Sequence, residues 1–517
     1  MKELQQALSE IHSIRTQVAH GTEFRGYGPA SIAMSGILAL TVAAIQTQWM
    51  AKPAKADLTI WLGVWAGTAV VGCLLAGVRR GLLCGCAVRG EALAMAGSDL
   101  PRDAGPDGVR VVAMLRKLAE LTSDEAGAQR VAWTDVWQRA RAFLRQQLRG
   151  LPVTIGTDTA GNQWARLPGG GGGVVIIGSH LDSVPDGGWL DGAYGVMCAV
   201  EVLRSLAARG PLPCTVALVE WADEEGARFG HSLFGSSAVA GTLNVAEVRG
   251  LADASGLRLG DVVAGHGVRL DRLDEARAEI RGARAYLEAH IEQGPVLERE
   301  GVAISAVSGT VGVERHRLTF RGQTAHSGST PMDTRRDAFL AAAATALAVR
   351  ASAVRHQGVG TVGAAWLRPG IVTAVAGETA IMVDERHPDA DALAAMLGEA
   401  RRASEEAARA EGCAVRWDPV FRARPQPFAA GLVDVVREVC TELTGHERVL
   451  PSWALHDATP MAGAVPTAML FTSSAKGISH AREEDTPQEH LRLGVEAFYR
   501  TVCRVIARSP GSTHPGK

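Results

Sequence analysis

The hydrophobic pattern is most regular between residues 174 and 219, where a strand, a helix and a second strand follow one another. The apolar run Val-Val-Ile-Ile at 174–177 predicts a short buried strand. From 194 to 209 apolar residues recur with a helical period, and 215–219 is again a short apolar run. This alternation predicts an open α/β sheet, in which ligands bind in the crevice at the carboxyl ends of the strands.

Similar patterns extend this α/β domain on both sides. Thr134 is the expected N-cap of one of the helices. The glycine run at 169–173 predicts a hairpin turn, because the Lys-Ser/Thr pair and the helix start of a phosphate-binding loop do not follow it. The other expected elements are helices at 109–121, 135–148, 431–443 and 489–507, and strands at 153–155, 163–166 and 467–471.

A different order of elements is expected between residues 303 and 419. Strand, helix, strand, strand, helix and strand follow one another, which fits a split βαβ sandwich. We therefore expect an α/β domain in two parts, 105–302 and 420–508, with an α+β domain at 303–419 inserted between them. The elements of the insertion are expected at 313–320, 337–354, 371–375, 379–384, 390–410 and 413–417.

Residues 1–95 do not share the α/β pattern. The runs 26–51 and 58–78 contain no charged residue and are separated by the short polar stretch AKPAKAD. Since about 20 apolar residues span a bilayer core, we predict a transmembrane hairpin with helices at about 28–50 and 58–78.

Charges around the hairpin indicate its orientation. Basic residues flank both outer ends, and the turn contains only two lysines, so the positive-inside rule places both ends in the cytoplasm. This predicts a protein of the inner (cytoplasmic) membrane whose α/β domain faces the cytoplasm. Buried core helices are an alternative, but no surrounding fold is available for them. A cleaved signal peptide is disfavoured by the long, glutamate-containing lead.

Composition and charge narrow the class of protein. The 517 residues exceed one domain, and the formal net charge of −2 does not indicate a nucleic-acid partner. The eight cysteines are scattered without a CxxC pair, which favours reduced core thiols in a cytosolic setting over a disulfide framework.

Metal-ligand residues gather directly after the expected strands. His180 follows the first strand, Asp191 opens the helix after it, and the second strand runs into EWADEEG. His290 in YLEAHIEQGP and His480 in GISHAREED add two more imidazoles. A lone histidine is more often a buried core residue, but imidazole and carboxylate together suit Zn²⁺, Mn²⁺ or Co²⁺. The pair Glu224 and Glu225 offers one ligand and one general base for a metal-activated water.

Long motifs in a fixed order give the chain a specific resemblance. It resembles the hydantoinase/carbamoylase family of metal-dependent amidohydrolases, within the dinuclear metallopeptidase (M20-type) group. The motifs are TDTAGNQWARLPG, GSHLDSVPDGGWLDGAYGV, EWADEEGARFGHSLFGSSAVAG, LEAHIEQGPVLE, AHSGSTPMDTRRDAF, LHDA and GISHAREE. The resemblance implies a dinuclear-metal exopeptidase-like α/β catalytic domain with an inserted ferredoxin-like lid and dimerisation domain, hence a homodimer. Members of this family are ordinarily soluble, so the membrane hairpin is a departure.

The resemblance also implies how two divalent ions would be held. One ion takes His180 and His290, the other takes Glu225 and His480, and Asp191 bridges them. Zn²⁺, Mn²⁺, Co²⁺ or Ni²⁺ would suit these ligands.

Further roles implied by the resemblance concern catalysis and substrate. Glu224 is the general base, and His326 reaches the active site of the partner subunit to hold the developing oxyanion. Arg386 grips the substrate carboxylate, and Gln293 contacts the substrate. Without the resemblance, these residues would be a solvated glutamate, a surface histidine, a strand-end arginine and a loop amide.

The chain departs from the family pattern on the substrate side. Thr373 replaces an asparagine thirteen residues before Arg386, and a hydroxyl replaces only part of the hydrogen bonding of an amide. Trp453 and Leu455 stand where the family has small residues before His456. These bulky side chains would narrow or reshape the pocket.

The expected activity is hydrolysis of the carbamoyl (ureido) C–N bond of N-carbamoyl-L-amino acids, releasing the amino acid, ammonia and carbon dioxide. Allantoate or another small ureido acid is an alternative substrate. An ordinary peptidase or acylase would share the metal set, but the HIEQG and RRDAF motifs disfavour it. A membrane-bound, non-catalytic binding protein with a degenerate pocket is the alternative of another class.

Overall fold

The computed structural model describes residues 105–508, which belong to the larger of two compact units of the chain. The expected membrane hairpin and the linker after it lie outside the described residues.

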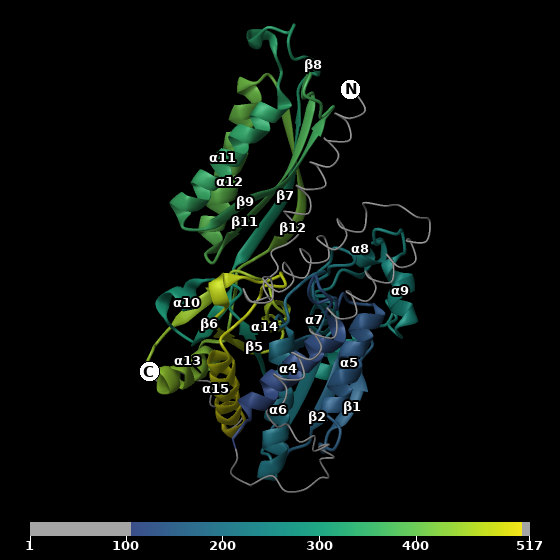
Figure 1. Cartoon of the computed structure of the whole chain (residues 1–517), viewed down its shortest axis with the longest axis vertical. Coiled ribbons are helices and arrows are strands. Elements are labelled where there is room, and N and C mark those ends of the chain that lie inside the picture. Colours follow the sequence, from purple (N-terminus) through teal and green to yellow (C-terminus); the bar gives the residue numbers. More distant parts are fainter. Residues whose placement is uncertain (1–104, 509–517) are drawn as a thin grey trace, which may run out of the picture. The chain divides into compact units, whose positions relative to one another are not determined.

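A mixed sheet forms the centre of the α/β domain (Figure 1). Nine strands of the described residues take part, in the order β1-β2-β4-β3-β5-β15-β6-β13, with β14 also paired to β6. The central strands β3 (Val174–His180), β4 (Thr215–Trp221), β5 (Ala283–Ile291) and β15 (Thr467–Thr472) are parallel. They are buried almost throughout, as parallel strands covered on both faces are. The other strands are β1 (Thr154–Thr157), β2 (Gln163–Leu167), β6 (Ile304–Thr310), β13 (Gln426–Pro427) and β14 (Val449–Ser452).

Helices surround this sheet, which confirms the α/β class expected from the sequence. Helix α6 (Ala193–Arg209) packs on β3, β4 and β5, and its two neighbours α4 (Gly108–Thr122) and α15 (Gln488–Ala507) pack against it. The hydroxyl of Thr134 accepts a hydrogen bond from the Trp137 amide at the start of α5 (Asp135–Gln147), so the predicted N-cap is confirmed. The remaining helices here are α7 (Phe234–Ala240), α8 (Val245–Arg249), α9 (Leu259–Gly265), η1 (Leu273–Ile280), α10 (Val296–Glu300), α13 (Ala430–Thr444), α14 (Ala458–Ala462) and η3 (Ala475–Gly477).

The inserted domain is a second, antiparallel sheet with two helices on one face (Figure 1). Its strands have the order β12-β7-β11-β9, and α11 and α12 pack side by side over a core that includes Phe320 and Val383. A short pair, β8 with β10, follows the far end of β7. The elements are β7 (Gly312–Arg321), β8 (Ala325–His326), η2 (Met332–Thr334), α11 (Ala338–His356), β9 (Val359–Arg368), β10 (Ala374–Val375), β11 (Glu378–His387), α12 (Ala390–Ala410) and β12 (Ala414–Ala423).

Helix α11 carries apolar residues on its buried face and also on an exposed face. It is the one helix of the described residues that is long and apolar enough to cross a membrane by length and composition, and 39% of its apolar stretch is buried. One face packs on the sheet of the inserted domain, whereas Leu340, Leu347 and Val354 are 44%, 69% and 73% exposed. These three residues, spaced by seven, form one stripe on the helix.

Two predictions from the sequence are wrong. The strand expected at 371–375 is mostly a loop, and the second strand of the four-stranded sheet in chain order is β9. Strand β9 was not predicted because this glycine-containing edge strand carries a weak apolar signal. The glycine run at 169–173 is not a hairpin turn. It joins β2 to β3, and β4 lies between these two strands in the sheet.

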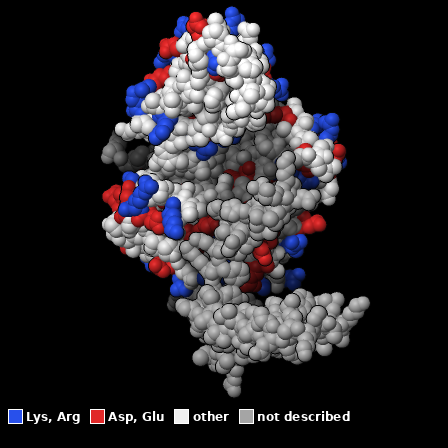
Figure 2. All heavy atoms as spheres, turned by 45° about the horizontal axis from the view of Figure 1, so that its top comes forward, with Lys and Arg blue, Asp and Glu red and all other residues white. Residues whose placement is uncertain are grey.

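The charges on the face shown in Figure 2 and the cysteines of the described residues follow no pattern of strong segregation or cross-linking. Figure 2 shows Lys and Arg interspersed with Asp and Glu over the face in view, without a field of one sign. The cysteines of the described part are all free, and Cys198, Cys214 and Cys440 are buried.

Candidate metal centre and active site

The predicted ligands meet at the carboxyl edge of the four parallel strands. His180 is the last residue of β3, and His290 is the second-last of β5. Glu225 follows the end of β4, His480 lies in the loop after β15, and Asp191 precedes α6. Strand ends therefore bring together residues that are up to 300 positions apart in the sequence, in the crevice where open α/β sheets bind ligands.

Asp191 lies at the centre of this cluster. Its Oδ1 is 3.2 Å from His290 Nε2 and 3.8 Å from His180 Nε2. Its Oδ2 is 3.1 Å from His480 Nε2, which in turn lies 3.4 Å from Glu225 Oε2. Two groups that could each hold a metal ion therefore share Asp191, one with the first two histidines and the other with Glu225 and His480.

The donor set fits divalent cations. Atoms that each lie about 2.1 Å from a tetrahedral ion are about 3.4 Å from one another, and the contacts of Asp191 with the three histidines measure 3.1, 3.2 and 3.8 Å. The two oxygens of one carboxylate face different histidines, which is the arrangement of a bridging ligand.

Burial shifts the pKa values of these groups. Hydrogen bonding to Asp191 raises the pKa of His480 to about 9, and burial raises the pKa of Glu225 to about 7. Burial also raises the pKa of the Glu224 carboxyl well above its ordinary value. Asp191 behaves oppositely, since hydrogen bonds to His290 and His480 outweigh its burial and hold its pKa well below the usual range. Crowded and buried carboxylates ionise with difficulty on their own, and a bound cation would stabilise their charged forms.

Two carboxylates that the sequence reasoning missed support the cluster. Asp182 accepts hydrogen bonds from the amides of Glu224 and Glu225 at 3.2 and 3.0 Å. Glu484 accepts from the Asp191 amide at 3.0 Å and from Ser479 Oγ at 2.7 Å. Both are buried and stand inside the GSHLD and REED motifs, so the common pairing of metal ligands with supporting carboxylates could have identified them.

Arg130 is a further missed residue. It is fully buried, and its Nε donates to the Leu181 carbonyl at 2.7 Å. Burial disfavours its charge, and the negative charges of Glu484 and Asp191 oppose that effect. The surrounding sequence AQRVAW carries no motif that would have indicated a buried cation.

Backbone strain concentrates at the cluster. His480, Gln293 and Asp223 have φ values of 57°, 56° and 59°, in the left-handed region that non-glycine residues rarely adopt. Gly192 has a φ of 61°, and a Cβ there would lie 2.4 Å from the ring of His180. Only glycine therefore allows this close approach between the loop and the histidine.

The four residues expected to contact the substrate lie in two places. Gln293 and Arg386 lie at or beside the metal cluster, and His326 and Thr373 lie at the far end of the inserted domain. Gln293 lies at the cluster, where its Nε2 donates to Asp191 Oδ2 at 3.0 Å. The guanidinium of Arg386 instead donates to Asp384 at 2.8 Å and to the Trp453 carbonyl at 2.7 Å. Trp453 is three residues before His456, whose ring centroid lies 4.4 Å from that of His290. Arg386 thus reaches the loop beside the metal cluster.

His326 and Thr373 lie together at the other end of the inserted domain. Both are exposed, and the Ser327 amide donates to the Thr373 carbonyl at 3.0 Å. Arg386 pairs with Val313 at the start of β7, whereas β8 follows the end of this ten-residue strand. A strand of that length spans about 30 Å. The structure therefore does not bring His326 and Thr373 to Arg386 of the same chain.

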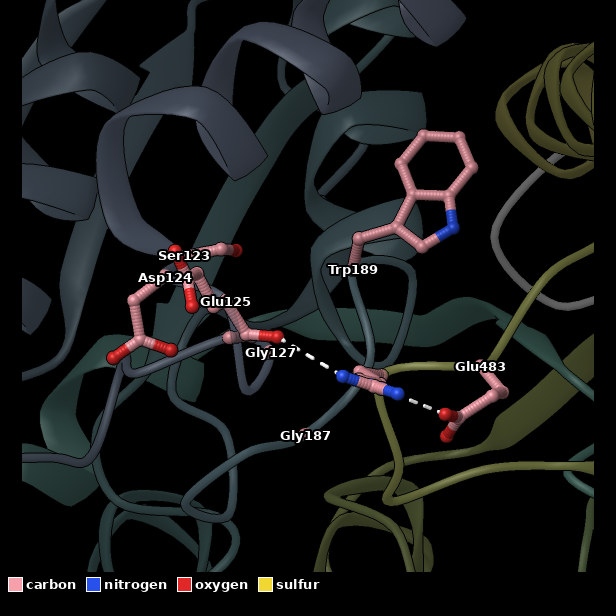
Figure 3. Close-up of a pocket in the computed structure, with 9 residues that line it drawn as sticks. Ser123, Asp124, Glu125, Gly127, Gly187, Trp189 and Glu483 are labelled. Atoms are coloured by element: carbon pink, nitrogen blue, oxygen red, sulfur yellow. Dashed lines mark hydrogen bonds and ion pairs between the residues drawn. The ribbon is translucent and has the colours of Figure 1, made fainter. Parts of the chain in front are cut away.

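A surface pocket opens beside the loops that carry Asp191 and His480 (Figure 3). Arg482 crosses it, donating to the Glu125 carbonyl at 3.3 Å and to Glu483 Oε1 at 2.7 Å. Trp189 also lines it. None of the predicted site residues is part of its lining, so this pocket is distinct from the metal cluster.

Comparison with known proteins identifies relatives over about three quarters of the chain. The profile of peptidase family M20/M25/M40 matches residues 176–504. An N-carbamoyl-L-amino-acid amidohydrolase of Paenarthrobacter aurescens is 32% identical over 76% of this chain and 97% of its own length. An allantoate amidohydrolase of Escherichia coli is also 32% identical, over 74% of this chain and 94% of its own length. The crystal structure of a hydantoinase/carbamoylase family amidase from Burkholderia multivorans superposes with a TM-score of 0.71 at 31% identity, covering 78% of this chain and 99% of that one.

Proposed function

The chain belongs to the hydantoinase/carbamoylase branch of peptidase family M20/M25/M40, and we propose that it is an amidohydrolase that cleaves the ureido C–N bond of N-carbamoyl-L-amino acids. Allantoate and related ureido acids are the alternative substrates, because relatives named for both activities are equally similar to it. The observation that carries the proposal is Asp191, whose two oxygens face the two predicted metal groups.

In this proposal two divalent ions are held by the predicted ligands. His180 and His290 would hold one ion, Glu225 and His480 would hold the other, and Asp191 would contribute one carboxylate oxygen to each group. Such ions supply Lewis acidity that lowers the pKa of water and polarises a carbonyl.

Glu224 is the proposed general base. It is buried, and its Oε2 lies 3.7 Å from His180 Nε2. Its amide is anchored by Asp182, so the carboxylate is held beside the proposed ligands. Glu224 accepts a proton from the attacking water and returns it to the leaving nitrogen. Collapse of the tetrahedral intermediate breaks the C–N bond to the amino-acid nitrogen and releases the free amino acid and carbamic acid, which breaks down to ammonia and carbon dioxide.

Arg386 and Gln293 are the proposed substrate anchors on the same chain. The guanidinium fork of Arg386 would receive the substrate carboxylate, with the Asp384 pairing holding the fork in place. Gln293 contacts Asp191 directly, so its amide lies where the ureido group meets the metals.

Turnover by metal-loaded protein tests this proposal. Substrates are N-carbamoyl-L-amino acids, allantoate and dipeptides, with ammonia release as the readout for the ureido acids and release of free amino acid as the readout for the dipeptides. Glu224→Gln should retain metal and lower turnover by about 10²–10⁴, because it removes proton transfer and not ligation. Glu406→Gln, an exposed change on α12, is the matched control. Cleavage of dipeptides alone would favour a peptidase, and full metal content without any turnover would favour a binding protein.

We further propose that the active unit is a homodimer formed through the inserted domain. The exposed stripe of Leu340, Leu347 and Val354 on α11 supports this, since contiguous exposed apolar residues mark association surfaces. His326 also supports it, because about 30 Å of β7 separates this residue from Arg386. The amides of Gly328 and Ser329 both donate to its Nδ1 at 3.1 Å, which leaves Nε2 with the proton. The exposed His326 is therefore a donor of the kind that an oxyanion needs.

Mixing two inactive variants tests the exchange of His326 between chains. His326→Ala alone should lower turnover by about 10²–10³, as removal of an oxyanion donor does. A mixture with Glu224→Gln should recover roughly a quarter of wild-type activity, because half of the dimers are mixed and each has one intact site of two. A mixture that stays inactive despite proven subunit exchange would place His326 within its own site or outside catalysis.

The N-terminal residues give a last proposal. We propose that 1–95 tether the enzyme to the cytoplasmic membrane as a two-helix hairpin, with the catalytic domain facing the cytoplasm. The support is the sequence itself: two charge-free runs long enough to span a bilayer and basic flanks outside them.

A further inference from the structure

The loop from Ser452 to His456 connects the two places where the substrate would be held. At one end the Trp453 carbonyl accepts a hydrogen bond from Arg386 Nη1 at 2.7 Å. At the other end the ring of His456 lies 4.4 Å from the ring of His290, centroid to centroid. The loop therefore runs from the proposed carboxylate anchor to the proposed metal ligands.

Ser452 holds this loop in a tight conformation. Its hydroxyl donates to the Ala454 carbonyl at 2.8 Å and accepts from the Ala454 amide at 3.2 Å. The same hydroxyl lies 2.8 Å from His456 Nε2, and both Ser452 and His456 are buried. The backbone that carries Trp453 and Leu455 is thus fixed at three points within five residues.

Trp453 and Leu455 are half-buried apolar side chains at a polar site. Neither belongs to the residues packed against the two hydrophobic cores of the described part. Burial in a core thus does not account for them, and water contact with an indole and an isobutyl group is unfavourable. A ligand that covers these side chains would remove that contact.

We propose that Trp453 and Leu455 form an apolar wall of the substrate pocket and select ureido acids with apolar side chains. This inference rests on the proposed function. A substrate with its carboxylate at Arg386 and its ureido group at the metals has its α-carbon between them, beside this loop. An apolar substituent there gains burial against the wall, whereas a polar one loses water without a hydrogen-bond partner in return.

The test compares two substrates of similar size and different polarity, N-carbamoyl-L-leucine and N-carbamoyl-L-asparagine. The metal-loaded full-length protein should prefer the leucine derivative by at least about tenfold in kcat/KM. Trp453→Ala and Leu455→Ala should each reduce this ratio by about tenfold, through loss on the leucine derivative. Leu455→Asn keeps the branched shape of the side chain and inverts its polarity, so it should shift the preference towards the asparagine derivative.

Controls separate this inference from folding and from the proposed function. Leu257→Ala truncates an exposed leucine of another loop and should leave the ratio unchanged. Metal content and melting temperature report whether each variant is folded. Hydrolysis without a preference, or a preference that survives in all three variants, overturns the apolar wall and leaves the proposed function standing. In the two alanine variants, a ratio that falls because the asparagine derivative gains shows a steric plug and also overturns the apolar wall. No hydrolysis of any ureido acid overturns the proposed function and this inference with it.

Discussion

Glu385 in the inserted domain has a buried carboxyl group, which predicts that the folded state loses stability as the pH rises. On β11 it faces the same side as Ile381 and Val383, which are core residues. Its side chain is 0% exposed, and within the described residues neither carboxylate oxygen has a hydrogen-bond partner. A buried carboxyl without a partner is stable in its neutral form and costly in its charged form.

The magnitude follows from the pKa. Burial, together with the charges of Glu314, Glu399 and Asp384, raises the pKa of Glu385 to about 7 from an ordinary value of 4.5. That difference corresponds to about 3 kcal/mol of lost stability once the group is ionised in both states. Because the folded-state pKa is the higher one, the loss is absent below pH 4.5, grows as the pH rises, and is complete above pH 7.

Glu385→Gln removes the charge and keeps the shape. Its advantage over the wild type in free energy of unfolding should grow by about 2.5 kcal/mol between pH 5 and pH 8. Urea denaturation of both proteins at the two pH values measures this difference, and effects of bound metal cancel because both chains carry the same ligands. Glu406→Gln on the exposed face of α12 is the control and should show no such growth. An advantage that is independent of pH would refute the assignment of Glu385 as a buried acid.

Three further predictions concern metal, assembly and membrane. His480→Ala should lower the metal content from about two ions per chain to at most one, measured by elemental analysis, and full occupancy would remove His480 from the site. Leu347→Arg should convert the proposed dimer to a monomer in light scattering and lower turnover with it, whereas Glu406→Arg on α12 should do neither. Deletion of residues 1–95 should give an active protein that needs no detergent, and a full-length chain that is already soluble without detergent would contradict the hairpin.

Much of the catalytic domain could be predicted because its signals are local. The period of the apolar residues indicated β3, α6 and β4, and the metal-ligand residues stood where these elements end. Since parallel strands end at a common edge, His180 and Glu225 had to lie close together. The long motifs then identified the family, which the comparisons confirm.

The parts that could not be predicted depend on contacts between distant segments. Strand β4 lies between β2 and β3 in the sheet, and the residues of the glycine run 169–173, which joins β2 to β3, do not indicate this order. Strand β9 was missed because it is a half-exposed edge with glycine at two positions. Arg130 was not predicted because the carboxylates that stabilise its buried charge are brought around it only by the fold.

Two positions that depart from the family sequence pattern, Trp453 and Thr373, lie near opposite ends of strand β7. Arg386 and the Trp453 loop meet at the start of β7, and Thr373 lies with His326 beyond its end. In the proposed dimer a pocket therefore combines Trp453 of one chain with Thr373 of the other. Replacing an amide by the hydroxyl of Thr373 removes hydrogen-bonding capacity from that pocket, and Trp453 adds apolar surface to it. Both changes make the same pocket less polar although they lie on different subunits, so a less polar ureido acid would satisfy both at once.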